Sequence, residues 1–368
     1  MKVIKRADVP EMRSIVVDGV THDLGVLKHW RKEPHLKGIL PRDLDVSLAW
    51  VRLEKDQVLD PHIHPVHSLV VCCEGAVRST GDLEASLEEG DIMIIPTGYR
   101  HGFVGAGTNG FWGLSIQFES LALYEDLDSP LVTFLGPDHD SSAHVDAVTI
   151  LIQKNEHFVK RFGQARIFGM LSSGAFGRPD KRARLLDLLQ VWSSMFQKIL
   201  YARCAFTDSR KFALVSRAHL DDEFGHDATL GAGRAAAMQV WDPILESTAQ
   251  WFLNKMLSVD DAEKTVLVHL VLEGAAIAFY ERFRHVMGER DEAFSHFAAH
   301  TGGDTPDVKH MKMGLDVLRQ FPLRDHGSLL EIQRRGWDMF DAMFDRIADL
   351  LEKAPSPQPE DEALVALD

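Results

Sequence analysis

The hydrophobic pattern of this chain changes once, and that change limits the folds it can adopt. From about residue 44 to residue 119, apolar residues form short strand-like runs separated by turn signals such as Glu-Gly, Gly-Asp and Pro-Thr-Gly. From about residue 145 onward they follow the period of amphipathic helices instead. Because strands and helices bury apolar faces at different periods, the sequence predicts a β domain followed by an all-α domain.

The predicted strands belong to a small antiparallel barrel or sandwich. They are expected at residues 46–53, 67–73, 85–87, 92–95 and 111–118. We assign residues 1–125 to this domain. A polar stretch punctuated by proline and glycine follows, and we interpret residues 126–144 as a linker.

The predicted helices form a bundle that spans residues 145–353. They are expected at residues 145–163, 181–205, 210–226, 235–255, 261–287, 289–300, 306–319 and 328–353. Residues 354–368 are rich in proline and acidic side chains, and their apolar content is too low for packing. We therefore expect a disordered acidic tail there.

Composition narrows the range of partners. The chain has 40 basic and 55 acidic side chains, a formal charge of −15 and no basic cluster, so nucleic acid is not an expected partner. Its first residues contain no apolar core of signal-peptide length, and no apolar run approaches the roughly 18 residues that a membrane span needs, so neither segment is expected. Its three cysteines, Cys72, Cys73 and Cys204, cannot form a disulfide framework. We expect a cytoplasmic protein with a small-molecule substrate and no membrane partner; the choice between monomer and homodimer stays open.

Three histidines of the predicted β domain have the spacing of metal ligands. His62 and His64 are two residues apart, which places both imidazoles on one face of a strand. A turn at Gly90, a buried strand and a second turn at Gly98 then lead to His101. Three neutral imidazoles with open coordination positions can bind a divalent transition metal.

The stretch from residue 60 to residue 101 resembles both motifs of the cupin family. The resemblance implies a cupin β-barrel with a mononuclear metal site at His62, His64 and His101, and His67 is a further candidate. It departs from the family at Ser68, where a carboxylate ligand commonly follows the first two histidines. The alternative is a cupin barrel that keeps its histidines without metal and serves as a binding module.

The predicted helices also carry carboxylates and histidines at metal-ligand spacing. Glu223 and His226 are three residues apart, as are Asp307 and His310, so each pair shares a helix face. Glu273 lies within an apolar run, where an unpaired carboxylate needs a cation. Two such pairs with an inward glutamate on a third helix make up most of the ligand set of a two-metal centre in a helical bundle.

This second domain resembles the heme-oxygenase-like di-iron oxidases, which are related in fold to the TenA and PqqC groups. The residues that match family ligands are Glu223, His226, Glu273, His300, Asp307 and His310, with His219 and Asp304 as further candidates. The interval between His300 and Asp307 is longer than in the family, and Gln197 stands in the likeliest register of an additional glutamate. In that register the ligand is missing, and His219 or Glu156 could replace it.

Two more histidines of this domain require interpretation. His269 lies one turn before Glu273 and is expected to be a ligand or a neighbour of one. Glu292, His296 and His300 form a stripe on one predicted helix. We expect His296 on a solvated face and His300 at the metal.

The combined resemblance implies an iron-dependent oxidoreductase of specialised metabolism that uses O2. It would hold two Fe²⁺ ions in the bundle, with Glu223 and Glu273 as the catalytic carboxylates, and one in the cupin, with Mn²⁺ as the alternative metal. An external donor would supply electrons for N-oxygenation, or a related oxidation, of a small amine or amino-acid-like substrate. The pairing resembles the N-nitrosating enzymes of streptozotocin biosynthesis, in which the modules occur in the opposite order. The alternatives are a non-catalytic small-molecule sensor with a helical scaffold, and a cupin mononuclear-iron dioxygenase with a structural bundle.

Overall fold

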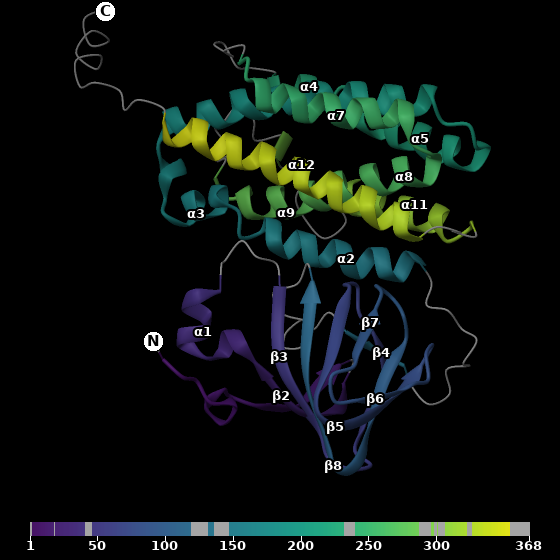
Figure 1. Cartoon of the computed structure of the whole chain (residues 1–368). Coiled ribbons are helices and arrows are strands. Elements are labelled where there is room, and N and C mark those ends of the chain that lie inside the picture. The colour runs from purple at the N-terminus through teal and green to yellow at the C-terminus, as the bar shows by residue number, and fades with distance from the viewer. Residues whose placement is uncertain are drawn as a thin grey trace, which may run out of the picture. The chain divides into compact units, whose positions relative to one another are not determined.

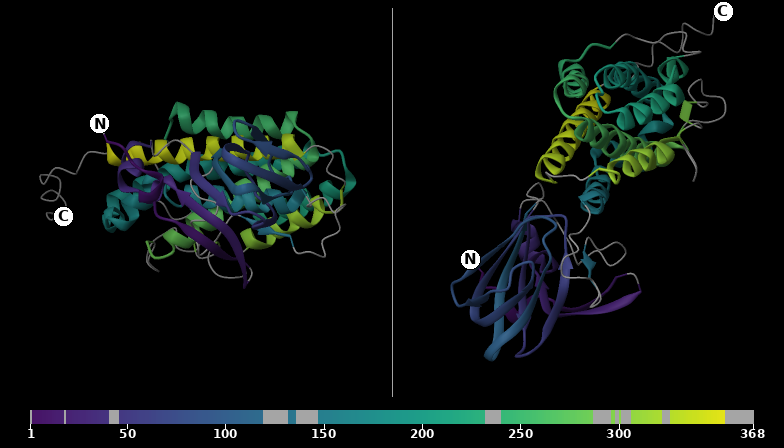
Figure 2. Two further views of the ribbon diagram at one scale, coloured as in Figure 1. Left: turned by 60° about the horizontal axis from the view of Figure 1, so that its bottom comes forward. Right: turned by 90° about the vertical axis from the view of Figure 1, so that its right-hand side faces the viewer.

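The computed structural model describes residues 2–17, 19–40, 46–118, 132–135, 147–231, 240–286, 296–297, 300, 306–321 and 326–353. It confirms the predicted fold class, an antiparallel β-barrel followed by a helical region (Figure 1). The chain forms two compact units, Met1–Lys154 and Asn155–Asp368, whose ribbons can also be followed in Figure 2.

The first unit contains an antiparallel sheet, nine-stranded over the described residues, that curls into a near-closed barrel. Its strands are β1 (Met12–Val17), β2 (Val20–His29), β3 (Val46–Leu53), β4 (Val58–Ile63), β5 (Ser68–Gly81), β6 (Ser86–Glu88), β7 (Ile92–Ile95), β8 (His101–Phe118) and β9 (Thr133–Phe134). Short helical turns, η1 (Arg6–Asp8), η2 (Trp30–Lys32) and α1 (Pro34–Ile39), lie near its start. The long strand β8 pairs with β3, β4 and β5 and so links the parts of the sheet.

Sequence prediction located the central strands and missed those at the start of the barrel. β3 and β7 have the predicted bounds. β1 and β2 were not predicted, because only part of each is buried and the apolar signal is weak. β8 begins at His101 rather than at residue 111, and its first half is rich in glycine. A Cβ at Gly105 would lie 2.0 Å from the carbonyl oxygen of Glu54, so only glycine permits this close pairing.

The inner face of the barrel follows from the alternation of side chains along β5 and β8. Ser68, Val70 and Cys72 are buried on β5, while the residues between them are partly exposed. Across the ladder, Ser68 pairs with Gln117 and Val70 pairs with Ser115. Cross-strand partners point to the same face, so a polar strip lies inside the barrel beside its apolar core.

The second unit is helical. Its elements are α2 (Ala147–Phe162), α3 (Arg166–Ser172), η3 (Ala175–Gly177), α4 (Pro179–Ala205), α5 (Arg210–Glu223), α6 (His226–Gly231), α7 (Pro243–Ser258), α8 (Asp261–Thr265), η4 (Val266–Leu272), α9 (Glu273–Phe283), α11 (Pro306–Leu318) and α12 (His326–Glu352). The boundary between the units lies within α2, after Lys154. Asp242 caps α7 by accepting hydrogen bonds from the N–H groups of Ile244 and Leu245. Among the described helices, none combines the length and apolar content needed to cross a membrane.

Two predicted helices are interrupted. The helix expected at residues 210–226 ends at Glu223, and α6 begins at His226 after a turn in which Gly225 has a positive φ of 84°. The helix expected at residues 261–287 contains the π-helical segment η4, all of whose residues are buried. Neither break changes the hydrophobic pattern enough to be predicted from it.

Close helix packing surrounds the π-helical segment. A Cβ at Gly314 of α11 would lie 2.3 Å from Cβ of His269, and a Cβ at Gly336 of α12 would lie 2.7 Å from Leu267. Both glycines therefore let a helix backbone approach η4 more closely than any larger residue would allow. Most of the predicted helix 289–300, most of the linker at residues 126–144, and the tail at residues 354–368 lie outside the described residues.

Candidate metal sites

Three histidines meet on the inner face of the barrel. His62 lies on β4, His64 directly follows that strand, and His101 begins β8; all three are buried. The ring centroids of His62 and His64 lie 4.3 and 4.7 Å from that of His101. One ligand atom from each ring lies within 4.8 Å of those from the other two.

Backbone carbonyls fix the orientation of each of these rings. Nδ1 of His62 lies 2.8 Å from the carbonyl oxygen of Asp60, and Nδ1 of His64 and His101 each make an equivalent 2.9 Å contact. Since a carbonyl oxygen only accepts, each Nδ1 carries the proton and each Nε2 keeps the lone pair that a metal requires. Burial, followed by the neighbouring imidazoles, lowers the pKa of all three rings, to about 3 for His64 and His101. The rings are therefore neutral at pH 7 and fit a divalent transition metal.

The fourth position of the barrel site is occupied by a neutral side chain. Ser68 is 2% exposed, and its Oγ lies 3.3 Å from Nε2 of His64. His67 is exposed and does not join the three histidines, because neighbouring residues at the start of β5 point to opposite faces. The prediction of His67 as a further ligand is not supported by this arrangement.

In the helical unit, five buried side chains from three segments converge. They are His219 and Glu223 of α5, Glu273 at the start of α9, and Asp307 and His310 of α11. Nδ1 of His310 lies 3.5 Å from Oε1 of Glu223 and 3.8 Å from Oε2 of Glu273. Nε2 of His219 lies 2.8 Å from Oε1 of Glu273. Two groups of three can each offer ligand atoms within 4.8 Å of one another: His219, Glu223 and His310, and Glu273, Asp307 and His310.

Polar atoms in this cluster lack hydrogen bonds although they are buried. Among the described residues, no partner is found for Oε1 of Glu223, Oε1 of Glu273, Oδ2 of Asp307, Nδ1 of His310 or either ring nitrogen of His219. The 2.8 Å contact between His219 and Glu273 does not have hydrogen-bond geometry. Buried polar atoms are nearly always paired, so unpaired atoms that converge on one point indicate a cation-binding site.

The charges of the cluster also indicate a cation-binding site. No Lys or Arg of the described residues forms an ion pair with Glu223, Glu273 or Asp307. Burial would lower the pKa of His310, but the Glu273 and Glu223 carboxylates raise it to about 9. Burial, with repulsion from the two glutamates, raises the pKa of Asp307. The cluster is thus short of positive charge, which protonated histidines or metal ions would supply.

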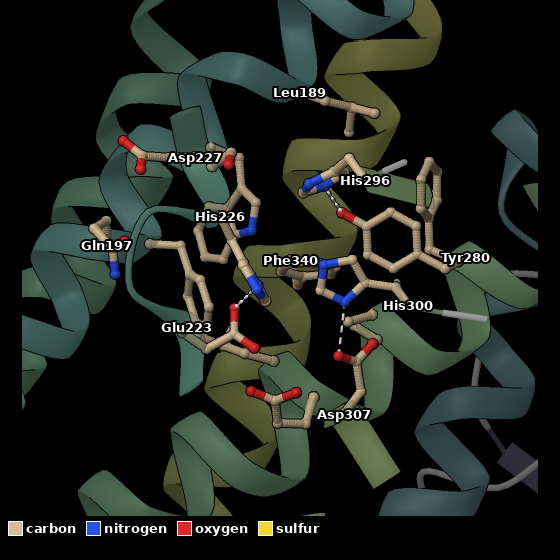
Figure 3. A pocket seen from close by; sticks show the side chains of 18 of the residues that line it. Leu189, Gln197, Glu223, His226, Asp227, Tyr280, His296, His300, Asp307 and Phe340 are labelled. Atoms are coloured by element: carbon tan, nitrogen blue, oxygen red, sulfur yellow. Dashed lines mark hydrogen bonds and ion pairs between the residues drawn. The ribbon is translucent and has the colours of Figure 1, made fainter. Parts of the chain in front are cut away.

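Two predicted ligands lie beside the cluster and bind its carboxylates. Nδ1 of His226 lies 2.8 Å from Oε2 of Glu223, and Nδ1 of His300 lies 2.8 Å from Oδ1 of Asp307 (Figure 3). Neither histidine belongs to the groups whose ligand atoms converge within 4.8 Å. In this arrangement they orient the carboxylates.

His296 is buried, which corrects the expectation of a solvated face. It is 4% exposed, and its Nε2 lies 2.9 Å from the hydroxyl oxygen of Tyr280. Its Nδ1 lies 3.1 Å from Oγ1 of Thr229, whose own hydroxyl donates to the carbonyl oxygen of His226. Nδ1 of His296 must therefore donate to Thr229, which leaves Nε2 to accept from Tyr280. Tyr280 also stacks on His300, with ring centroids 4.4 Å apart.

The other candidates have structural partners or lie elsewhere. His269 is fully buried and accepts a 2.8 Å hydrogen bond from the buried guanidinium of Arg203. Gln197 accepts a 2.7 Å hydrogen bond from the N–H of Gly225 and so supports the turn between α5 and α6. Glu156 is exposed and does not line the pocket beside the cluster. Asp304 lies outside the described residues.

Sequence reasoning missed some residues of this site. Arg203 is 1% exposed within α4 and lies beside His269, and nothing in its spacing indicated an inward position. Asp222 is exposed, and its Oδ2 lies 3.3 Å from Nε2 of His310. Its position next to Glu223 in the acidic run of residues 221–223 was the available signal.

A pocket opens beside the carboxylates and is lined mainly by aromatic and apolar side chains (Figure 3). Glu223, Glu273 and Asp307 contribute its acidic side. Its aromatic lining comes from α4, α9 and α12 and consists of Trp192, Phe196, Phe279, Tyr280, Phe340 and Phe344. A small molecule that entered this pocket would contact both the polar cluster and aromatic side chains.

Comparison with known proteins identifies the first unit and finds a relative whose match reaches the second. A family model described as Cupin matches residues 38–118. The uncharacterized protein RP592 of Rickettsia prowazekii is 34% identical over 206 residues, which is 56% of this chain and 97% of that protein. Since the first unit ends at Lys154, a match of this length extends into the helical unit.

Solved structures show only local similarity. An uncharacterized conserved protein with a double-stranded β-helix domain from Klebsiella pneumoniae is 21% identical, with a TM-score of 0.21, over 22% of this chain and 74% of that one. Oxalate decarboxylase from Bacillus subtilis is 17% identical, with a TM-score of 0.28, over 36% of this chain and 31% of that one. A cupin superfamily protein from Desulfitobacterium hafniense is 18% identical, with a TM-score of 0.19, over 21% of this chain and 70% of that one. The chain thus spans about a third of oxalate decarboxylase.

Proposed function

The chain belongs to the same family as the uncharacterized protein RP592 of Rickettsia prowazekii and has an N-terminal cupin domain, and we propose that it is an iron-dependent oxidoreductase that uses O2. The helical unit would hold two metal ions and the cupin one. The substrate would be a small amine or amino-acid-like molecule, oxidised at nitrogen or in a related reaction. Electrons would come from an external donor.

One observation carries the proposal for the helical unit. Glu223, Glu273, Asp307 and His310 are 3%, 3%, 1% and 0% exposed, and each has a ligand atom without a hydrogen-bond partner among the described residues. Removing one unpaired carboxylate from water is already unfavourable, and three within one cluster require cations. Mixed carboxylate and imidazole ligands suit iron or manganese.

The residues divide naturally between two ions. His219 and Glu223 would bind one ion, and Asp307 would bind the other. His310 belongs to both groups but has one inward nitrogen, so it would serve only one ion, and the carboxylate of Glu273 would help to hold the pair. The family resemblance adds His226 and His300, whose ring nitrogens already contact the carboxylates of Glu223 and Asp307.

The side chains around these ligands would prepare the site for its chemistry. When bound, a pair of irons supplies electrons to O2 and oxidising power toward a substrate. Trp192, Phe196 and Phe279 line the adjacent pocket and would give a substrate an apolar surface against which to align. Tyr280 fixes His300 by stacking and fixes His296 by a hydrogen bond. The protein thus supplies geometry, dryness and charge.

The cupin unit would bind its metal through Nε2 of His62, His64 and His101, because their Nδ1 atoms are held by backbone carbonyls. A cupin dioxygenase with a structural bundle is the second candidate function, and the three fixed imidazoles favour it.

Iron loading under anaerobic conditions, followed by exposure to O2, tests the proposal. We expect about three irons per chain in the wild type, about one in Glu273→Gln and about two in His101→Ala. We also expect O2 consumption that rises when amines are added and is lost in Glu273→Gln. A protein that takes up its irons yet consumes no O2 with any amine or amino acid would refute the oxidase assignment. Loss of O2 consumption in His101→Ala alone would favour the cupin dioxygenase.

A further inference from the structure

We propose that the metal site of the barrel binds a small apolar monocarboxylate, whose carboxylate group contacts the metal and the neutral side chains of Ser68, Ser115 and Gln117. This inference rests on the proposed metal at His62 and its two partner histidines. It names the class of molecule that the cupin cavity accepts.

The charge of the cavity lining favours an anionic ligand. The cavity is lined by Leu24, Leu27, Val51, Leu53, Leu59, His62, His64, Ser68, Val70, Ile95, His101, Phe103, Phe111, Ser115 and Gln117, and none of these described residues is an aspartate, glutamate, lysine or arginine. A divalent ion on three neutral imidazoles therefore leaves two positive charges in a cavity of low dielectric constant. Such charge is strongly unfavourable unless an anion accompanies it.

The second argument is the position of Ser68. Here Ser68 is 2% exposed and lies 3.3 Å from Nε2 of His64, so it contributes a hydroxyl and no charge. An anion must then come from solution, and hydroxide from a bound water is the competing source.

The third argument is a set of hydrogen-bond donors on the same inner face. Ser68 and Gln117 are direct cross-strand partners, and Ser115 pairs with Val70, two residues further along β5. Gln117 and Ser115 are 6% and 8% exposed. Within the described part of the chain, their side chains make no hydrogen bond to protein. Hydroxyl and amide donors beside a metal suit a carboxylate, which only accepts.

The remaining wall of the cavity determines the polarity of the part of the ligand beyond its carboxylate. It is made of leucine, valine, isoleucine and phenylalanine side chains, with Phe103 and Phe111 among the largest. An ammonium group would find no carboxylate to pair with and would be repelled by the metal, so amines and amino acids are disfavoured here. A second carboxylate would be buried without a partner. An apolar tail with one carboxylate satisfies every part of the cavity.

Ligand titration of the Co²⁺-loaded full-length chain tests the inference. Isovalerate, isovaleramide and isoamylamine have similar shapes and differ in charge. The readout is the change in Co²⁺ visible absorption, with heat of binding as a second measurement. We expect isovalerate to bind at least about tenfold more tightly than the amide, and the amine to show no binding. We expect this response to disappear in His101→Ala, which removes the barrel site and keeps the helical one.

Variants separate the carboxylate site from the metal site. Ser68→Glu supplies an internal carboxylate, so we expect the metal content to stay the same and isovalerate to bind at least about tenfold more weakly. Gln117→Leu removes a donor without adding charge and is expected to weaken isovalerate binding with unchanged metal content. Ser14→Glu makes the same charge change on an exposed position of β1 and should have no effect.

The outcomes distinguish failure of the metal site from failure of the carboxylate inference. If His101→Ala leaves the Co²⁺ content of the chain unchanged, the barrel holds no metal, and both the metal site and this inference fail. If the barrel binds Co²⁺ but isovalerate binds no better than its amide, only the carboxylate inference fails. Equal binding of isovalerate to the wild type and to Gln117→Leu and Ser68→Glu would also overturn it.

Discussion

Gly314→Ala is the most informative single substitution in the helical unit. Gly314 is buried on α11, the helix that carries Asp307 and His310, and it contacts the π-helical segment that precedes Glu273. An alanine Cβ would lie 2.3 Å from Cβ of His269, whereas ordinary contact begins near 3.4 Å, so the two atoms would have to separate by about 1.1 Å. Cβ of His269 is fixed to the backbone and cannot rotate away.

The magnitude follows from two opposing terms. Overpacking in a close-packed interior costs about 1–3 kcal/mol, and replacement of glycine by alanine within a helix contributes about 1 kcal/mol of stability. Because an atom anchored to the backbone must move by about 1.1 Å, the overpacking cost falls in the upper part of that range, about 2–3 kcal/mol, and we expect Gly314→Ala to destabilise the helical unit by about 1–2 kcal/mol. The same shift would move α11, and with it His310, so we expect weaker binding of metal to the helical unit.

A matched control comes from α3. Gly169 is exposed in the interior of that helix, and nothing lies within 4 Å of the Cβ that alanine would add. Gly169→Ala should therefore stabilise the unit by about 0.5–1 kcal/mol. Thermal unfolding followed by helical circular dichroism should place the two variants on opposite sides of the wild type, with Tm lower by about 4 °C and higher by about 2 °C. If Gly314→Ala unfolds at or above the wild-type temperature, the packing described around His269 is wrong.

Three further predictions concern stability and charge. Asp242→Ala removes the N-cap of α7 and the partner of Arg346, whose Nε and Nη2 donate to the carboxylate at 2.9 and 2.7 Å. Chemical denaturation should show that the free energy of unfolding falls by about 1–3 kcal/mol. An unchanged denaturation midpoint would contradict the capping role. Burial, followed by the charges of Arg31 and Lys32, lowers the pKa of His29 to about 4, so between pH 6.5 and 4 the unfolded chain binds a proton that the folded barrel does not. The stability that the barrel has above pH 6.5 should therefore decrease on acidification through this window. In thermal melts at stepped pH, His29→Gln should lose less stability than the wild type. Arg203→Met leaves His269 without its hydrogen-bond donor and replaces the guanidinium with an apolar side chain of similar length. We expect lower thermal stability and, by metal titration, an altered metal affinity of the helical unit. An unchanged metal affinity would show that Arg203 has no influence on the cluster.

The local sequence predicted those elements whose signals are local. β3 and β7 have their predicted bounds because their apolar runs end at clear turns. The first half of β8 was missed because its glycines resemble a turn, and their purpose is apparent only when β8 lies against the chain that follows β3. The break at Gly225 was missed because three-residue spacing between Glu223 and His226 fits a continuous helix as well as an interrupted one.

The same reasoning applies to the candidate sites. The spacing of His62 and His64 and the turn before His101 were sufficient to predict that three imidazoles meet. In the bundle, spacing indicated Glu223, Glu273, Asp307 and His310 and gave His219 only as a further candidate, because its proximity to His310 depends on how α5 packs against α11. His296 was assigned to solvent because a polar stripe on a helix does not reveal that Tyr280 and Thr229 cover it.

The central claim is that the buried carboxylates and histidines of the helical unit hold a pair of metal ions. Anomalous diffraction from crystals of the Mn²⁺-loaded full-length chain tests it most directly. We predict two anomalous peaks in the helical unit, both within coordination distance of Glu223, Glu273, Asp307 or His310. An unoccupied cluster in which protonated His310 pairs with Glu223 and Glu273 at full Mn²⁺ loading would contradict the claim.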